Sequence, residues 1–172
     1  MKIILSFFIT LSAMAYDASR DACAFHTKTH EHLKKIPRHL LMAISKIESG
    51  RLNPNSQQVE AWPWTINVEG KGYYFPTKHE AVKRVKELVA KGIKSIDVGC
   101  MQINLHHHKG AFKTIEEAFD PKLNTEYASK FLSSLRETHG SWAQAIAHYH
   151  SATPLHHIPY RKKVLDKWRE EN

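Results

Sequence analysis

Apolar residues recur along most of the chain at intervals of three and four, which is the spacing of one face of an α-helix. The clearest example is the segment 37–50, where Pro37 suits the first turn and Gly50 can end the helix in the left-handed conformation. The apolar positions of this segment form one stripe: Leu40, Leu41, Ile44 and Ile47. The pattern therefore predicts a helix packed against a core.

The same spacing predicts helices elsewhere in the chain. Three of them begin with a capping box, in which Thr77, Thr114 or Ser141 precedes a Glu or Gln by three residues. We expect the helix after Ser141 to end at Pro154 and the last helix to begin at Pro159. The remaining helices are predicted over 22–34 and 124–139.

One segment switches to a period of two, which is typical of a half-buried strand. Residues 64–68 alternate apolar and polar, residues 69–72 supply a turn, and residues 73–75 resume the strand pattern. The neighbouring segments are less regular: 51–58 is predicted to be a polar loop, and 95–102 to lead into a short turn or helix. The fold class predicted is α+β, mostly α, with one small inserted β-hairpin.

The first fifteen residues have the form of an export signal. Lys2 precedes an apolar run over residues 3–11 that is too short to span a bilayer, and residues 13–15 resemble a cleavage site. We therefore expect an exported, periplasmic protein whose single domain covers residues 16–172. A short membrane anchor is the alternative. No later apolar run approaches membrane length, so no integral membrane segment is predicted after cleavage.

The chain carries a formal net charge of +8. The basic residues are spread over helix faces rather than gathered in one patch, so no nucleic-acid partner is predicted. A mild positive field outside the cytoplasm favours an anionic polymer such as a cell-wall glycan.

The chain has two cysteines, Cys23 and Cys100. In an exported protein such a pair predicts one disulfide, here worth ~4–5 kcal/mol in the chain-entropy model. Two free buried thiols are the alternative. A catalytic cysteine is disfavoured because the disulfide would consume Cys100.

Glu48 is an acidic residue on the apolar stripe of segment 37–50, one turn after Ile44. Partial desolvation and the negative end of the helix dipole both raise the pKa of a carboxyl placed there. A carboxylic acid kept protonated near neutral pH suits general-acid catalysis. A helix-end side chain that points into solvent is the alternative.

The chain is rich in histidine, but the histidines do not form a recognisable metal site. His26 and His30 are four residues apart, yet no third ligand follows at a standard interval. Residues 106–108 are three adjacent histidines, which cannot easily face one ion. We predict neither a metal nor another cofactor.

Three short stretches occur in a recognisable order. They are Glu48-Ser49-Gly50, then the segment 99–104 (GCMQIN), then the segment 147–151 (AHYHS). This set resembles the catalytic domain of soluble lytic transglycosylases, which have a lysozyme-like fold and act on the bacterial cell wall. It is most similar to the small exported forms linked to secretion and conjugation machines. The resemblance covers roughly residues 20–168.

The resemblance implies a role for each matching residue. Glu48 would be the sole acid and base, and the hydroxyl of Tyr149 would lie against it and hold its orientation. The substrate glycan would contact Gln102, the backbone around Gly99 and Met101, and neighbouring positions. Ser49 is expected to support the site rather than react. The full set of expected substrate-binding residues is Ser49, Gly99, Met101, Gln102, Asn104 and His150.

The chain departs from the family pattern at several points. Cys100 replaces the usual Leu, while His148 and His150 flank Tyr149 where Ala and Asn are usual. The hairpin segment is longer than in the simplest members. The change at His150 bears on the polar network beside Glu48.

The resemblance implies that the partner is the glycan strand of peptidoglycan, which is cut without water to leave 1,6-anhydromuramic acid ends. A monomer is expected, and a secretion or conjugation apparatus is a candidate partner. The nearest competing hypothesis is a hydrolytic muramidase, for which Asp97 or Glu60 could supply a second carboxylate. Two weaker hypotheses are a non-catalytic glycan-binding or assembly protein of a secretion system and a histidine-rich metal carrier.

Overall fold

The computed structural model describes residues 21–172, so the predicted export signal at residues 1–15 lies outside the described residues. Helical residues 21–34 come first. The elements that follow are α2 (Leu40–Ser49), β1 (Gly50–Leu52), β2 (Val59–Ala61), β3 (Thr65–Val68), β4 (Lys71–Tyr74), α3 (Lys78–Ala90), β5 (Ile96–Val98), β6 (Ile103–Asn104), α4 (Ile115–Ala118), α5 (Pro121–His139), α6 (Trp142–His150) and α7 (Pro154–Glu171). The predicted α+β fold class, mostly α, is confirmed.

The predicted helix starts are confirmed by their caps. The side chains of Thr77, Thr114 and Ser141 each accept a hydrogen bond from the backbone N–H three residues later. At Thr77 the side chain of Glu80 also accepts from the backbone N–H of Thr77, which completes the capping box. These local bonds fix where α3, α4 and α6 begin.

Both ends of the helix predicted over 37–50 differ from the prediction. The predicted helix over 37–50 begins later, at Leu40, because His39 adopts a left-handed conformation before it. Gly50 is extended, with φ of −65°, and starts β1 instead of ending α2 in the left-handed region. A Cβ at Gly50 would lie 2.1 Å from the carbonyl oxygen of Lys46, so glycine lets the chain turn sharply from helix into strand.

The last helix also begins earlier than predicted. Helix α7 starts at Pro154 and continues through Pro159 instead of beginning there. Proline removes one helical hydrogen bond. Buried His157 and Tyr160 lie on either side of Pro159 and pack this part of α7 against the rest of the domain, which offsets that loss.

The predicted hairpin is confirmed, and it belongs to a larger sheet. Strands β3 and β4 pair antiparallel from Thr65↔Tyr74 to Val68↔Lys71. Strands β5 and β6 extend this pair into a four-stranded sheet of order β4-β3-β5-β6. Strand β5 lies in the segment 95–102, which was predicted to lead into a turn or helix, and β6 follows directly after it. The predicted loop at 51–58 connects the strands of the separate β1–β2 pair. These strands are only two or three residues long, too short to show a periodicity.

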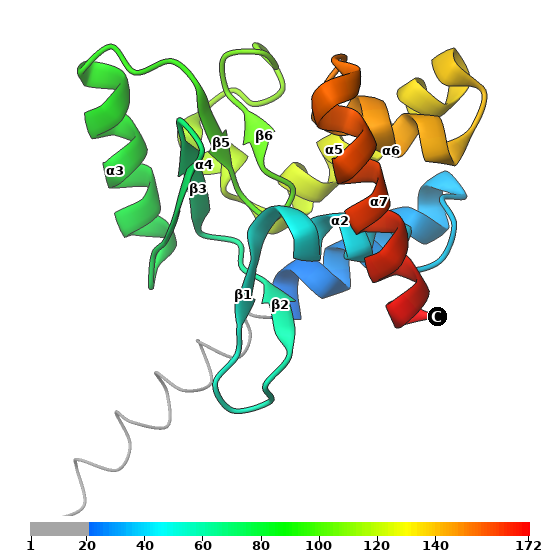
Figure 1. The fold of residues 1–172 in the computed structure, drawn as a ribbon. Coiled ribbons are helices and arrows are strands. Elements are labelled where there is room, and N and C mark those ends of the chain that lie inside the picture. Colours follow the sequence, from blue (N-terminus) through cyan, green and yellow to red (C-terminus); the bar gives the residue numbers. More distant parts are fainter. Residues whose placement is uncertain (1–20) are drawn as a thin grey trace, which may run out of the picture.

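The core is divided into two clusters. The larger one lies among α2, α5, α6 and α7, and the smaller one lies between the four-stranded sheet and helices α3 and α4. Figure 1 shows the sheet and α3 on one side of the domain and α5, α6 and α7 on the other. Within residues 21–172, no helix combines the length and apolar character that crossing a bilayer requires.

Candidate active site

A cleft of about 360 Å³ is lined by side chains from both parts of the domain. The helical side contributes Glu48, Phe131, His148, Tyr149 and His150. The sheet side, with its turn and the following loop, contributes Asn67, Asp97, Gln102, Asn104, His107 and His108. Side chains from three helices (α2, α5 and α6) and three strands of the sheet therefore meet at a single polar opening.

Glu48 lies in the last turn of α2 and is partly buried at the edge of this cleft. The hydroxyl of Tyr160 donates a hydrogen bond of 2.5 Å to its Oε1 atom. Burial raises the pKa of Glu48 to about 8, the bond from Tyr160 acts against this rise, and the charge of Asp97 adds to it. The carboxyl is therefore mostly protonated at neutral pH.

The tyrosine that contacts Glu48 is not the one predicted. Tyr149 lines the cleft, but its hydroxyl donates to the carbonyl oxygen of Met101 at 2.9 Å, and Tyr160 of α7 contacts Glu48 instead. The expected bond from Tyr149 to Glu48 is therefore wrong. Burial and the nearby Glu48 raise the pKa of both phenols well above the usual value, so both remain donors.

The sheet side of the cleft presents a row of polar residues. Asn67 of β3, Asp97 of β5 and Asn104 of β6 occupy neighbouring register positions, and all three line the cleft. The Nδ2 atom of Asn104 donates to Asp97 at 2.7 Å. Burial raises the pKa of Asp97, while the bond from Asn104 and the nearby His107 act against that rise. This polar row is suited to hydrogen bonding with a sugar.

Only one of the two acidic residues considered as a second carboxylate lies at the cleft. Asp97 lines it, whereas Glu60 lies in β2 and accepts hydrogen bonds from Asn53 and Ser56. Glu60 is absent from the cleft lining, so it is excluded as a partner of Glu48 in this site.

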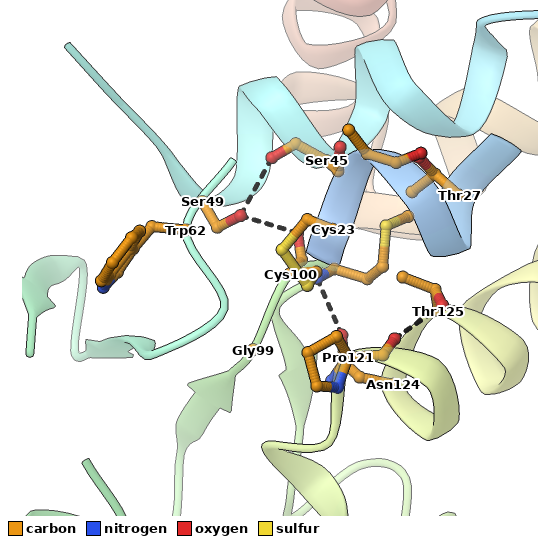
Figure 2. The surroundings of a disulfide bond; sticks show 12 residues. Cys23, Thr27, Ser45, Ser49, Trp62, Gly99, Cys100, Pro121, Asn124 and Thr125 are labelled. Carbon is orange, nitrogen blue, oxygen red and sulfur yellow. Dashed lines mark hydrogen bonds between the residues drawn. A yellow bond between two sulfur atoms is a disulfide. The ribbon is translucent and has the colours of Figure 1, made fainter. Parts of the chain in front are cut away.

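The turn between β5 and β6 is tied to the helical side of the domain by a disulfide and by hydrogen bonds. The predicted disulfide is confirmed: Cys100 in this turn is bonded to Cys23 of the first helix (Figure 2). The hydroxyl of Ser49 lies 2.8 Å from the carbonyl oxygen of Cys100, and the Oδ1 atom of Asn124 accepts from the N–H of Met101 at 2.9 Å. These contacts fix the turn to helices on the opposite side.

The expected substrate-binding residues divide into two groups. Gln102, Asn104 and His150 line the cleft. Ser49, Gly99 and Met101 do not: the side chains of Ser49 and Met101 are fully buried, and the backbone of Met101 already bonds to Asn124 and Tyr149. They support the turn, as the sequence suggested for Ser49.

Gly99 has a packing reason for being glycine. Its φ is +83°, and a Cβ there would lie 2.5 Å from the side-chain amide of Asn124. This close approach lets Asn124 donate to the carbonyl oxygens of Val98 and Ala118. The expected approach of the Gly99 backbone to a sugar is therefore replaced by its approach to a buried amide.

Tyr160 was not among the predicted site residues. It is 7% exposed. A buried tyrosine hydroxyl usually has a hydrogen-bond partner, and that rule was the signal that could have linked Tyr160 to an acceptor such as Glu48. Asn67, His107 and His108 were also missed as cleft residues. Within the described part of the chain, no group of His, Cys, Asp or Glu is arranged to hold a metal ion.

Comparison with known proteins identifies one family. A family model described as "Transglycosylase SLT domain" matches residues 26–162. This range contains Glu48, the whole cleft lining and Tyr160. No curated protein and no solved structure matches the chain.

Proposed function

The chain belongs to the transglycosylase SLT domain family, whose lysozyme-like members act on peptidoglycan, and we propose that it is a lytic transglycosylase. The bond cleaved is the β-1,4 link between N-acetylmuramic acid and N-acetylglucosamine. The observation that carries the proposal is the partly buried carboxyl of Glu48, which accepts a hydrogen bond from Tyr160 at the edge of a polar cleft. This burial raises its pKa to about 8.

In the first step, the proton of Glu48 passes to the bridging oxygen as the bond from this oxygen to C1 of the muramic acid breaks. The N-acetylglucosamine leaves with a free 4-hydroxyl. The electron-poor C1 remains, and Glu48 is now ionised. The hydroxyl of Tyr160 donates to Oε1 and stabilises this carboxylate.

In the second step, the C6 hydroxyl of the muramic acid attacks C1. Glu48 accepts the hydroxyl proton, a 1,6-anhydro ring forms, and the enzyme returns to its protonated state. No water is consumed, so one carboxyl serves as acid and then as base. This differs from glycosidases that share the two roles between two carboxyls.

A hydrolytic muramidase is the second candidate, and the position of Asp97 favours it. Asp97 lies in the cleft and acts electrostatically on Glu48. A carboxylate there could orient a water for attack on C1, which leaves a reducing end. The two reactions differ in product mass by one water.

Mass spectrometry of digested peptidoglycan separates the candidates. We expect anhydro ends from the wild type and a loss of at least about 10³-fold in rate for Glu48→Gln, which keeps the shape but cannot donate the proton. Reducing ends alone would identify a muramidase. Equal cleavage by Glu48→Gln would overturn the role of Glu48, and binding without cleavage by the wild type would indicate a glycan-binding protein.

We also propose that the protein acts in the periplasm as a monomer, beside a secretion or conjugation apparatus. The export pattern of residues 1–15 and the motif resemblance support this proposal. Cell fractionation tests the location. Recovery of the protein from the cytoplasm alone would contradict it.

A further inference from the structure

We propose that His150 is a positioning residue whose ring covers Tyr160 and keeps the hydrogen bond between Tyr160 and Glu48 away from water. The proposal concerns the acid of the proposed transglycosylase reaction and rests on that function for its catalytic consequence. His150 departs from the Asn that the resemblance leads us to expect at this position.

The geometry shows a stack of two rings from two helices. The imidazole of His150, the last residue of α6, lies 4.5 Å from the ring of Tyr160 in α7, with an angle of 10° between the planes. His150 is exposed, whereas Tyr160 is 7% exposed. The imidazole therefore has one face on Tyr160 and is itself in contact with solvent.

The cover acts on Glu48 through Tyr160. The phenol hydroxyl that His150 shields is the one that donates to Oε1 of Glu48. Burial is the largest cause of the raised pKa of Glu48. Removal of the imidazole would let water reach the phenol and the carboxyl, and hydration favours the ionised carboxyl.

Titratable groups from three elements interact with Glu48. They are Tyr149 of α6, Tyr160 of α7 and Asp97 of β5. His156 and Lys163 of α7 act on His150. Burial is the main cause of the lowered pKa of His150, and these two neighbours lower it further. The stacked imidazole is therefore neutral at neutral pH.

A flat ring is the property that the cover needs, because stacking excludes water without requiring a proton. Phenylalanine at position 150 therefore preserves the cover, while alanine removes it. His156→Ala is the matched control, since it removes an exposed imidazole close to His150 that makes no stack with Tyr160.

Titration of Glu48 by carbon-13 NMR tests the cover without any substrate. The protein is labelled at glutamate carboxyls, and the signal of Glu48 is assigned by its loss in Glu48→Gln. We expect the wild type, His150→Phe and His156→Ala to titrate near the pKa of about 8, and His150→Ala to titrate about one unit lower. His150→Asn, with a short polar side chain, should behave as His150→Ala does.

Two results would overturn the proposal. One is a pKa of Glu48 in His150→Ala that equals the wild-type value. The other is a pKa in His150→Phe as low as in His150→Ala, because the imidazole nitrogens rather than the ring cover would then matter. Near-ultraviolet circular dichroism verifies that each variant is folded.

The catalytic consequence is measured separately on peptidoglycan. We expect His150→Ala to lower kcat about fivefold at pH 8 with little change in KM, and to move the alkaline decline of kcat to lower pH. His150→Phe should keep the alkaline decline of kcat at the wild-type pH, since the ring cover over Tyr160 is preserved. Absence of cleavage by the wild type would refute the proposed function while leaving the titration valid. Wild-type cleavage with an unchanged profile in His150→Ala would refute the cover.

Discussion

The two walls of the cleft differ in what surrounds their acidic groups. On the helical wall, Glu48 lies against the buried phenol of Tyr160, and its pKa rises to about 8. On the sheet wall, Asp97 lies between Asn67 and Asn104 and accepts a hydrogen bond from the latter. One wall buries a carboxyl so that it keeps its proton, and the other presents a row of hydrogen-bonding groups. The acid proposed for the chemistry and the polar row suited to hydrogen bonding with a sugar therefore come from separate parts of the fold.

The loss of activity in Glu48→Gln is the largest expected effect. The second largest concerns the disulfide that links the two walls. Replacement of both Cys23 and Cys100 by alanine removes a crosslink between residues 77 positions apart. We expect the free energy of unfolding to fall by ~4–5 kcal/mol in the chain-entropy model. Urea unfolding of the double variant measures this. A loss below about 1 kcal/mol would show that the hydrogen bonds of Ser49 and Asn124 hold the walls together without the disulfide.

The next effect is a gain in stability from Glu48→Gln. The pKa of Glu48 is about 8 in the folded chain and ordinarily 4.5, so the unfolded chain loses its proton first as pH rises. Wild-type stability therefore falls between these two pH values. The glutamine variant avoids this loss, and we expect it to be more stable by roughly 2–4 kcal/mol at pH 8.5.

Urea unfolding of both proteins at pH 4 and pH 8.5 checks the sign. At pH 4 the folded and unfolded carboxyls are both mostly protonated, so the two proteins should differ little. If the difference in free energy of unfolding between the glutamine variant and the wild type is the same at both pH values, Glu48 titrates normally. That result would contradict its burial.

Tyr160→Phe should have a smaller effect, confined to the helical wall. It removes the donor to Glu48, so the ionised carboxyl loses a stabilising contact and kcat should fall about 10- to 30-fold. The pKa of Glu48 should rise, which moves the alkaline decline of kcat to higher pH. Tyr149→Phe is the control, because its hydroxyl bonds to Met101 instead. A larger loss in Tyr149→Phe would reverse the assignment of the two tyrosines.

The smallest effect is expected from the sheet wall. Asp97→Asn removes a charge that raises the pKa of Glu48, so the alkaline decline should move to lower pH, opposite to its shift in Tyr160→Phe. The new amide can still accept from Asn104, and kcat should change by no more than about fivefold. Asn67→Ala, at the neighbouring register position, should raise KM without moving the decline. A 10³-fold loss of kcat in Asp97→Asn would instead favour a two-carboxylate muramidase.

Much of the fold could be predicted from local signals in the sequence. The caps at Thr77, Thr114 and Ser141 and the period-two segment before the turn at 69–72 act within a few residues, so they were recognised. Strands β5 and β6 could not be found this way, because their pairing with β3 and with each other depends on partners distant in the chain. The end of α2 was mispredicted for a related reason: the extended conformation of Gly50 depends on its pairing with Ala61.

In the candidate site, too, local signals identify some residues, while others depend on contacts distant in the chain. Glu48 could be proposed from its place on an apolar stripe, because that placement is a property of one helix. Its hydrogen bond to Tyr160 spans 112 positions of the chain, and only packing of α7 against α2 decides which of two tyrosines reaches the carboxyl. The packing roles of Gly99 and Met101 were likewise hidden, since they depend on Asn124.

The location of Cys100 in the turn behind the cleft has a consequence for the timing of activity. Where glutathione and thioredoxin keep thiols reduced, the chain lacks its covalent brace. If the proposed function and export hold, a newly made copy has a weakly supported cleft until it reaches an oxidising compartment. The need to oxidise two sulfur atoms would then delay full activity until the proposed substrate is within reach.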